Sequence, residues 1–277
     1  MSALQAVTAS GSAAGHSIEF RNVSIRFNSF DAVSGVSLRI QPGEFVCLIG
    51  PSGCGKSTLL SAAAGFLGRR GDAPGAVEGE VLVNGERVRG PDISRGVVFQ
   101  SSEALFPWRT VRENVAFGPR IRGIRGGELR DLIDYYIALV GLDHAADRFP
   151  SQLSGGMRQR VQLARVLANQ PRVILMDEPL GALDAQTRSV MQREIERLWQ
   201  ETRCTMVFVT HDLDEAIKLG DRVVTMTAGP AAGIKSVYDI NLERPRDETT
   251  SAAIELHRTL RDDVAEEVLK TLRSQRR

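Results

Sequence analysis

Residues 50–57 constrain the fold of this chain more than any other segment. They read Gly-Pro-Ser-Gly-Cys-Gly-Lys-Ser, and they lie between the apolar run 45–49 and Thr58-Leu59-Leu60, which predicts a strand, a loop and a helix in that order. Glycines let such a loop fold around a phosphate, and the amides of the loop and of the helix N-terminus act as donors to it. The chain is therefore predicted to bind a nucleoside triphosphate. The residues expected to contact the nucleotide are Gly50, Pro51, Ser52, Gly53, Cys54, Gly55, Lys56, Ser57 and Thr58.

Composition limits the classes of protein that fit. A chain of 277 residues with 42% hydrophobic content can bury one domain, or one domain with a subdomain. It contains no run of about 18 apolar residues, so any membrane role is expected to be peripheral. A net charge of +1 gives no electrostatic argument for a nucleic-acid partner. The three cysteines, Cys47, Cys54 and Cys204, lack the spacing of a zinc site or a redox pair and are expected to be reduced thiols.

Apolar segments alternate with amphipathic ones along residues 17–230, the predicted main domain. Strands are predicted at residues 18–27, 36–40, 45–49, 80–83, 96–99, 173–176, 206–210 and 222–226. Several are continuous Val/Ile/Leu runs, which are typical of parallel strands buried on both faces. Between residues 99 and 173 the strand signal disappears, and helices are predicted at 127–140 and 155–168. An α/β fold is expected, with a helical subdomain of about residues 101–170 inserted into the nucleotide-binding sheet.

Three further segments carry separate predictions. Residues 1–16 are small and polar, lack the pattern of a signal peptide and are expected to form a disordered tail. Residues 65–79 are rich in Gly and Arg and are expected to form an extended surface loop. Residues 231–277 form a C-terminal extension in which an amphipathic helix should pack on its own domain, with dimer contact as the alternative. The apolar residues of that helix are Leu256, Leu260, Val264, Val268 and Leu272, four residues apart.

Two acidic residues, Asp177 and Glu178, follow the apolar strand 173–176. The carboxyl end of a strand beside a phosphate loop is where an α/β sheet binds ligands. Asp177 is predicted to hold Mg²⁺ through its water shell or together with Ser57, and Glu178 to accept a proton from the attacking water. An isolated Asp-Glu pair at a strand end would more often cap a helix. Its combination with the phosphate loop favours catalysis.

Residues 153–160 read Leu-Ser-Gly-Gly-Met-Arg-Gln-Arg, and they give the chain a specific resemblance. Ser154 is expected to cap the following helix, while Gly155 and Gly156 let a phosphate approach its amides. The segment resembles the signature of the nucleotide-binding subunits of ATP-binding cassette (ABC) transporters, LSGGQ, with Met157 in place of Gln. The helix starts too far along the chain to serve its own phosphate loop. The resemblance implies that it serves a partner's loop, so that two subunits enclose two ATP molecules head to tail.

The resemblance covers about residues 18–226 and implies further roles. Gln100 would contact Mg²⁺ or water, His211 would touch the γ-phosphate and orient Glu178, and residues 181–184 would contact the dimer partner. Lys56, Gln100, Glu178 and His211 are the implied catalytic residues, and Ser57, Gln100 and Asp177 are the implied metal ligands. Phe27 would stack on adenine, with Phe20 and Phe30 as alternatives and a core role as the simpler reading for each. The implied fold is a P-loop NTPase with a mainly parallel core sheet, an antiparallel β subdomain and an inserted α-helical subdomain.

Several segments resemble the nitrate, sulfonate and taurine importer group: residues 90–91, 95–100, 106–108, 113–118 and 198–202. This implies an ATP hydrolase with ATP and Mg²⁺ as cofactors, acting as a homodimer or with a paired ABC subunit. Its partners would be a membrane permease and, indirectly, a periplasmic or extracellular solute-binding protein, and it would lie on the cytoplasmic face of the membrane.

Trp108 lies where members of this group receive the permease, although packing inside the helical subdomain is equally open. The alternative function is a soluble ABC ATPase for DNA repair, translation or cluster assembly, against which the single cassette argues. An exporter subunit is disfavoured by the resemblance alone.

Overall fold

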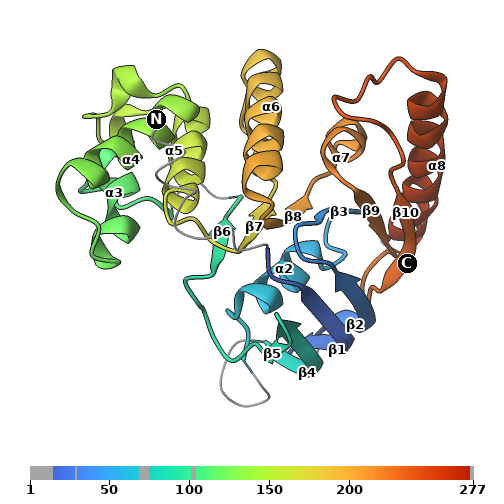
Figure 1. The fold of residues 1–277 in the computed structure, drawn as a ribbon. Helices are drawn as coiled ribbons and strands as arrows, with labels where there is room; N and C mark the ends of the chain where they lie inside the picture. The colour runs from blue at the N-terminus through green and yellow to red at the C-terminus, as the bar shows by residue number, and fades with distance from the viewer. Residues whose placement is uncertain (1–14, 29, 69–74, 101–103, 275–277) are drawn as a thin grey trace. The chain divides into compact units, whose positions relative to one another are not determined.

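The computed structural model describes residues 15–28, 30–68, 75–100 and 104–274. The chain divides into two compact units, labelled by their elements in Figure 1. Residues 15–92 and 205–274 form the terminal unit, and Ile93–Cys204 form the central unit. Most of the predicted tail 1–16, and residues 69–74 of the predicted surface loop, lie outside the described residues.

The terminal unit contains an antiparallel sheet in the order β2-β1-β4-β5. Its strands are β1 (Ile18–Phe27), β2 (Phe30–Ile40), β4 (Ala76–Val83) and β5 (Glu86–Arg87). The surface loop was expected to run to Gly79, and this predicted end is wrong. Ala76 and Val77 already pair with Arg26 and Ile25 of β1. Gly79 lies inside β4 at a register shift, and a glycine there interrupted the strand pattern in the sequence.

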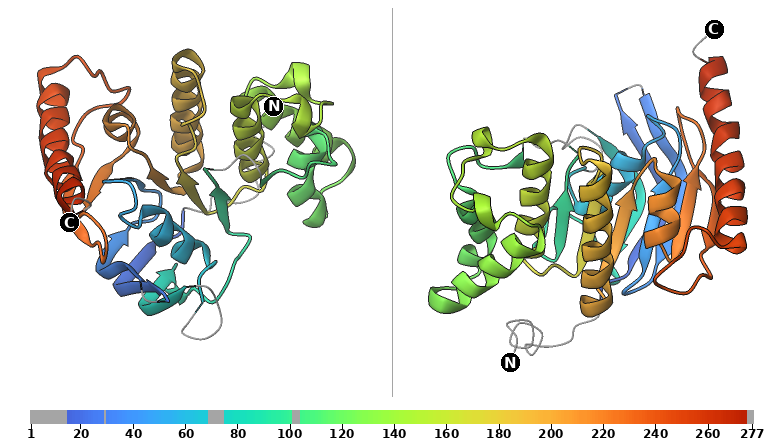
Figure 2. Two further views of the ribbon diagram at one scale, coloured as in Figure 1. Left: turned by 180° about the vertical axis from the view of Figure 1, so that it is seen from behind. Right: turned by 90° about the horizontal axis from the view of Figure 1, so that it is seen from above.

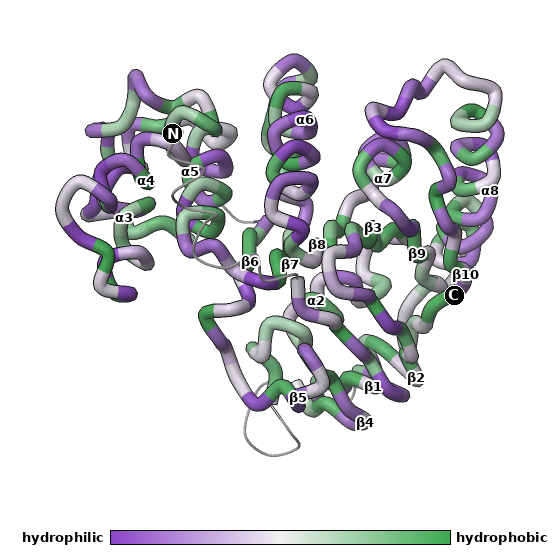
Figure 3. Tube along the Cα trace, viewed as in Figure 1, coloured by the Kyte–Doolittle hydropathy of each residue, from purple (hydrophilic) through white to green (hydrophobic). Residues whose placement is uncertain are grey.

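Four more strands of this unit are hydrogen-bonded in the order β10-β9-β3-β8, and the phosphate loop follows β3. They are β3 (Phe45–Ile49), β8 (Thr205–Val209), β9 (Arg222–Met226) and β10 (Ile234–Asp239). β3 pairs in parallel with β8 and β9, and β10 pairs antiparallel with β9. Every residue of β3 and β8 is buried, as predicted for parallel strands covered on both faces, and both strands are apolar in Figure 3.

Three helices pack in this unit: α2 (Lys56–Ala64), α7 (Leu213–Leu219) and α8 (Ser251–Ser274). α8 contacts α7 and β9, and it runs beside β9 and β10 in Figure 2. The expected apolar stripe on α8 is only partly right. Ala253, Leu260 and Glu267 are buried at a seven-residue spacing, whereas Leu272 is 51% exposed. A four-residue spacing drifts by about 40° at each step, so the stripe leaves the buried face toward the C-terminus.

The central unit pairs β6 (Arg95–Val98) in parallel with β7 (Val173–Asp177). Between these strands lie α3 (Val111–Ile121), α4 (Gly126–Leu139), the 3₁₀ turns η2 (Asp143–Ala145) and η3 (Pro150–Gln152), and α5 (Gly155–Leu167). α6 (Ala185–Thr202) follows β7, and α3, α4 and α5 pack on one another. Over the described part of the chain, no helix combines the length and the apolar character that a membrane crossing requires.

Candidate functional site

The phosphate loop, residues 50–55, joins β3 to α2 in the terminal unit. Gly55 adopts a left-handed conformation with φ 87°, and a methyl group there would lie 2.5 Å from Val33 Cγ2. Only glycine meets both conditions without strain. Among the described residues, no side chain caps α2, so the amides of its first turn are the donors that an approaching phosphate would meet.

Lys56 lies across this loop. Its Nζ donates to the carbonyl oxygens of Gly50 and Pro51, each at 2.9 Å, and lies 3.5 Å from Cys54 Sγ. The side chain is buried, so the loop holds one positive charge where phosphate oxygens would bind. Ser57, by contrast, is exposed at the start of α2. Burial raises the pKa of the Cys54 thiol while Lys56 acts in the opposite direction, and the thiol is a packed, free cysteine.

His211 lies at the same edge of the strands as the phosphate loop. β8 runs parallel to β3 with Val209 beside Leu48, so the residues that follow both strands emerge together. Two hydrogen bonds fix the turn that carries His211: Thr210 Oγ1 donates to Glu215 Oε2 at 2.6 Å, and the Asp212 amide donates to Thr210 Oγ1 at 3.0 Å. Asp212 then caps α7.

The three candidates for adenine stacking, Phe20, Phe27 and Phe30, differ in how far their side chains are buried. Phe20 belongs to the core of the antiparallel sheet. Phe27 is half-buried at the end of β1 and pairs in register with Phe30, which is 50% exposed. Burial therefore excludes Phe20 from stacking on a ligand in this conformation, and Phe27 stays the prediction.

In the central unit, Gln100 and Glu178 are hydrogen-bonded to each other. Gln100 Nε2 donates to Glu178 Oε2 at 2.9 Å, although 78 positions separate them in the chain. Glu178 follows Asp177, the last residue of β7, and has φ 46°, in the left-handed region. A non-glycine residue there costs about 1–3 kcal/mol unless its surroundings fix it, and such outliers cluster at functional sites.

Gln159 holds this turn against α5. Its Nε2 donates to the carbonyl oxygen of Glu178 at 3.0 Å, and its Oε1 accepts from the Ala182 amide at 3.1 Å. At Gly156 a methyl group would lie 3.0 Å from Leu183 Cδ2, so the start of α5 also packs on the same loop. The sequence had suggested no role for Gln159. An amide on the buried face of an amphipathic helix was the available signal.

Ser154 caps α5 as predicted, with its Oγ accepting from the Met157 amide at 3.2 Å. Apart from its chain neighbours and the nearby backbone of α5, no atom of the described residues lies within 4 Å of the position where a side chain of residue 155 would begin. The first turn of α5 can therefore be approached by a ligand at Gly155.

The donor set fits Mg²⁺ in chemistry. The hydroxyl of Ser57, the carboxylate of Asp177 and the amide oxygen of Gln100 are all oxygen ligands, and Gln100 uses its nitrogen on Glu178. Within the described ranges, no three or more His, Cys, Asp and Glu residues gather as a metal site. Mg²⁺ usually takes few protein ligands and keeps waters and phosphate oxygens, so each of these side chains is a chemically suitable ligand for it.

Trp108 stands out on the surface of the central unit, with 69% of it exposed. The ring centroid of Phe106 lies 5.7 Å from that of Trp108 and 4.6 Å from that of Phe117. Beneath them, the fully buried Asn114 donates to the carbonyl oxygens of Phe106 and Arg109. The alternative in which Trp108 packs inside the helical subdomain is wrong.

The predicted site residues thus belong to two sets. Lys56, the other residues of the phosphate loop and His211 lie in the terminal unit, while Gln100, Asp177, Glu178 and residues 154–156 lie in the central unit.

Comparison with known sequences gives a consistent picture. Residues 33–181 match the family model described as ABC transporter. An uncharacterised ABC transporter ATP-binding protein of Methanocaldococcus jannaschii is 47% identical over 246 residues, 89% of either chain. The taurine import ATP-binding protein TauB of Jannaschia sp. is 48% identical over 77% of this chain and 78% of its own length. The bicarbonate transport ATP-binding protein CmpC of Synechococcus elongatus is 46% identical over 79% of this chain, which spans 32% of that relative.

Solved structures agree with the sequences. The dimeric, post-hydrolysis structure of an ATP-binding cassette bound to ADP and Pi aligns with a TM-score of 0.70 and 31% identity. The alignment covers 81% of this chain and 99% of that one.

Proposed function

This chain belongs to the ABC transporter family and hydrolyses ATP, and we propose that it is the subunit that powers a membrane importer. The family and the P-loop NTPase fold predicted from the sequence are thereby confirmed. Relatives named for taurine and bicarbonate transport support an importer of a small solute, such as taurine, a sulfonate or nitrate.

The observation that carries the proposal is that one segment of the central unit bears both Gln100 and Trp108. Gln100 bonds the carboxylate of Glu178, and Trp108 projects from an aromatic platform anchored on Asn114. An exposed tryptophan on such a base is typical of an interaction surface. In the proposed function a permease binds there, and its movement reaches Glu178 through Gln100.

The hydrolytic step assigns one task to each residue. Lys56 and the first-turn amides of α2 bind the phosphates, and Glu178 accepts a proton from the attacking water. The oxygen of that water forms a bond to the γ-phosphorus as the bond from phosphorus to the bridging oxygen breaks, leaving ADP and phosphate. His211 orients the γ-phosphate and Glu178. Mg²⁺, held by Ser57, Asp177 and Gln100, would neutralise phosphate charge when bound.

Two copies of the chain, or one copy and a paired ABC subunit, are proposed to enclose two ATP molecules. Residues 154–156 of one subunit would complete the site built on the partner's Lys56, which the dimeric neighbour supports. The permease would hold the pair at the cytoplasmic face of the membrane, and a solute-binding protein would act indirectly. Nucleic acid has no part in the proposal.

Affinity purification from solubilised membranes tests the proposed coupling. The wild-type chain should co-purify with a permease of several membrane spans, and Trp108→Ala should lose most of that permease while its ATPase rate in solution is retained. Ile254→Ala is the matched control, because Ile254 is also an exposed apolar residue but lies on α8. Recovery of nucleic acid or a soluble assembly partner, without any permease, would instead support the alternative class of soluble ABC ATPase.

A further inference from the structure

We propose that Glu267, on the C-terminal helix α8, positions the phosphate loop through the backbone amide of Ala228. All residues concerned belong to the terminal unit. The inference rests on the proposed role of residues 50–58 in nucleotide binding, and it adds a residue outside the family motifs to that site.

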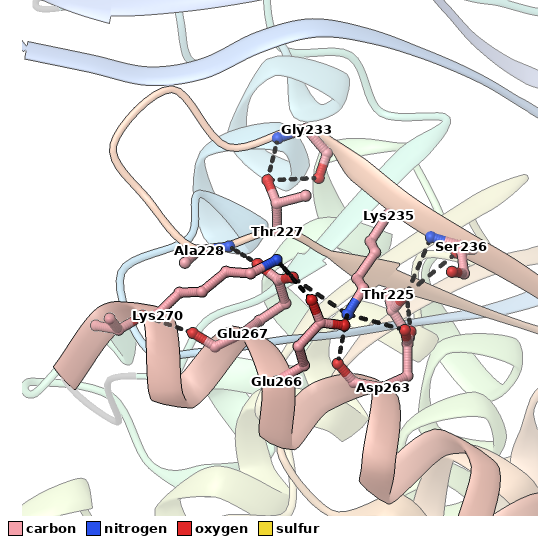
Figure 4. A network of polar contacts seen from close by, with 11 residues as sticks. Thr225, Thr227, Ala228, Gly233, Lys235, Ser236, Asp263, Glu266, Glu267 and Lys270 are labelled. Atoms are coloured by element: carbon pink, nitrogen blue, oxygen red, sulfur yellow. Dashed lines mark hydrogen bonds and ion pairs between the residues drawn. The ribbon is translucent and has the colours of Figure 1, made fainter. Parts of the chain in front are cut away.

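Glu267 is a buried charge with a complete set of partners (Figure 4). It is 2% exposed, and its Oε2 accepts from the Ala228 amide at 2.8 Å. Its Oε1 lies 2.7 Å from Lys270 Nζ and 3.1 Å from Lys235 Nζ. Burial raises the pKa of this carboxyl, but the bonds from Lys270, Ala228 and Lys235 outweigh burial and lower it below its usual value. The carboxylate is therefore ionised when it receives the amide of Ala228.

The chain around Ala228 packs directly on the phosphate loop. A methyl group at Gly229 would lie 3.1 Å from the carbonyl oxygen of Gly53, and one at Gly50 would lie 3.1 Å from that of Met226. The segment 226–229 therefore touches the loop near its start and near its middle. Displacement of Ala228 changes the surface against which the loop rests.

The loop that follows Ala228 is also hydrogen-bonded to β2, a second element that packs against the phosphate loop. The Ala231 amide donates to Asp31 O at 2.6 Å, and the Ser34 amide donates to Ala232 O at 3.0 Å. These bonds fix the loop on β2 beside Val33, whose side chain packs against Gly55. The hydrogen bond from Ala228 to Glu267 thus holds the segment that begins at Ala228 on α8. The same segment touches the phosphate loop directly and is hydrogen-bonded to β2.

Packing alone does not account for a carboxylate at this position. A buried charge costs free energy unless it is fully bonded, and an apolar side chain would fill the same space without that cost. The Glu267 carboxylate accepts a hydrogen bond from the Ala228 amide, which no strand pairing of β9 or β10 satisfies in the described structure.

The test compares Glu267→Ala with Glu266→Ala. Glu266 contacts the same lysines, at 2.6 Å from Lys235 and 2.8 Å from Lys270, but it is 57% exposed and bonds no amide of residues 226–229 among the described contacts. Titration with a fluorescent ATP analogue should show affinity about tenfold weaker in Glu267→Ala, with kcat at saturating ATP within about twofold of wild type. Glu266→Ala should stay within about twofold in both measurements.

Further variants separate this role from a merely structural one. Glu267→Gln retains an oxygen for the Ala228 amide and should recover most of the affinity, and amide exchange in peptides covering 45–56 and 226–234 should rise only in Glu267→Ala. Three results would overturn the proposal. Glu267→Ala could bind the ATP analogue with wild-type affinity, Glu267→Gln could lose as much affinity as Glu267→Ala, or Glu266→Ala could lose as much affinity as Glu267→Ala. If Glu267→Ala does not fold, Glu267→Leu replaces it as the variant without an acceptor.

Lys56→Ala distinguishes the role of Glu267 from that of the phosphate loop itself. Loss of nucleotide binding in Lys56→Ala, with an unaffected Glu267→Ala, would reject the role of Glu267 alone. Normal nucleotide binding in Lys56→Ala would reject the proposed phosphate loop itself.

Discussion

At the scale of single residues, Glu178 combines a conformation that costs energy with contacts that fix it. Its left-handed backbone is held by Gln159, and its side-chain carboxylate accepts from Gln100. Sequence motifs had predicted Glu178 and Gln100 but could not show that they meet, because hydrogen bonds between distant positions leave no local pattern. Gln159 and Glu267 were missed for the same reason.

Glu178→Gln should bind ATP but hydrolyse it about 10²–10⁴ times more slowly, since a general base contributes that factor. Glutamine keeps an oxygen that can accept from Gln100, so the turn should retain its shape. Single-turnover hydrolysis and nucleotide titration measure the two effects separately. Glu201→Gln, on the exposed surface of α6, is the control, and near-normal turnover in Glu178→Gln would reject the assignment.

At the scale of elements, the bounds of a strand or helix could be predicted from the sequence where burial produces a clear apolar pattern, and not elsewhere. The bounds of β3, a continuous apolar run, and of β9 were predicted to the residue, because all residues of β3 and all but Arg222 of β9 are buried. α3 was missed because Gly118 and Pro119 interrupt its apolar pattern, although the capping box of Thr110 and Glu113 marks its start. β10 contains only half-buried and exposed residues and gave no apolar run.

Ion pairs contribute to the docking of α8, and this contribution is expected to be sensitive to acid. Lys235 bonds Glu266 and Asp263 on the helix, and hydrogen bonds from Lys235 and Lys270 lower the pKa of Glu266 to about 2 from its ordinary 4.5. A carboxyl whose pKa is lowered by folding stabilises the folded state above its ordinary pKa, and this stabilisation disappears as the pH falls through the lowered value.

Lys235→Met should therefore lower the unfolding midpoint at pH 7, and its difference from wild type should shrink between about pH 4.5 and pH 2. Thermal unfolding followed by circular dichroism across this range measures the difference. A gap that is constant down to pH 2 would mean that Lys235 stabilises α8 by packing and not by charge.

At the scale of the whole molecule, the proposed head-to-tail pair predicts which defects can be combined. Ser154→Asp keeps the cap on α5 but places a negative charge where a phosphate would approach, and Lys56→Ala removes the charge of the phosphate loop. With the two substitutions on different chains of a mixed dimer, both should fall in one site and leave the other intact. With both on one chain, each site should carry one defect.

ATPase assays on the two mixed dimers, purified with two different tags, read out this prediction. The dimer with substitutions on different chains should keep substantial activity, and the dimer with both on one chain should lose nearly all of it. The reverse order would mean that each chain completes its own site.

Gln159 has a consequence for how such a pair would turn over. Its amide bonds the backbone of Glu178, which is assigned to the chain's own ATP, and it lies on the helix whose first turn is assigned to the partner's ATP. In the proposed pair, a rearrangement around one nucleotide would therefore be transmitted through Gln159 to the helix that encloses the other nucleotide. The two hydrolytic events of the pair would then be mechanically coupled.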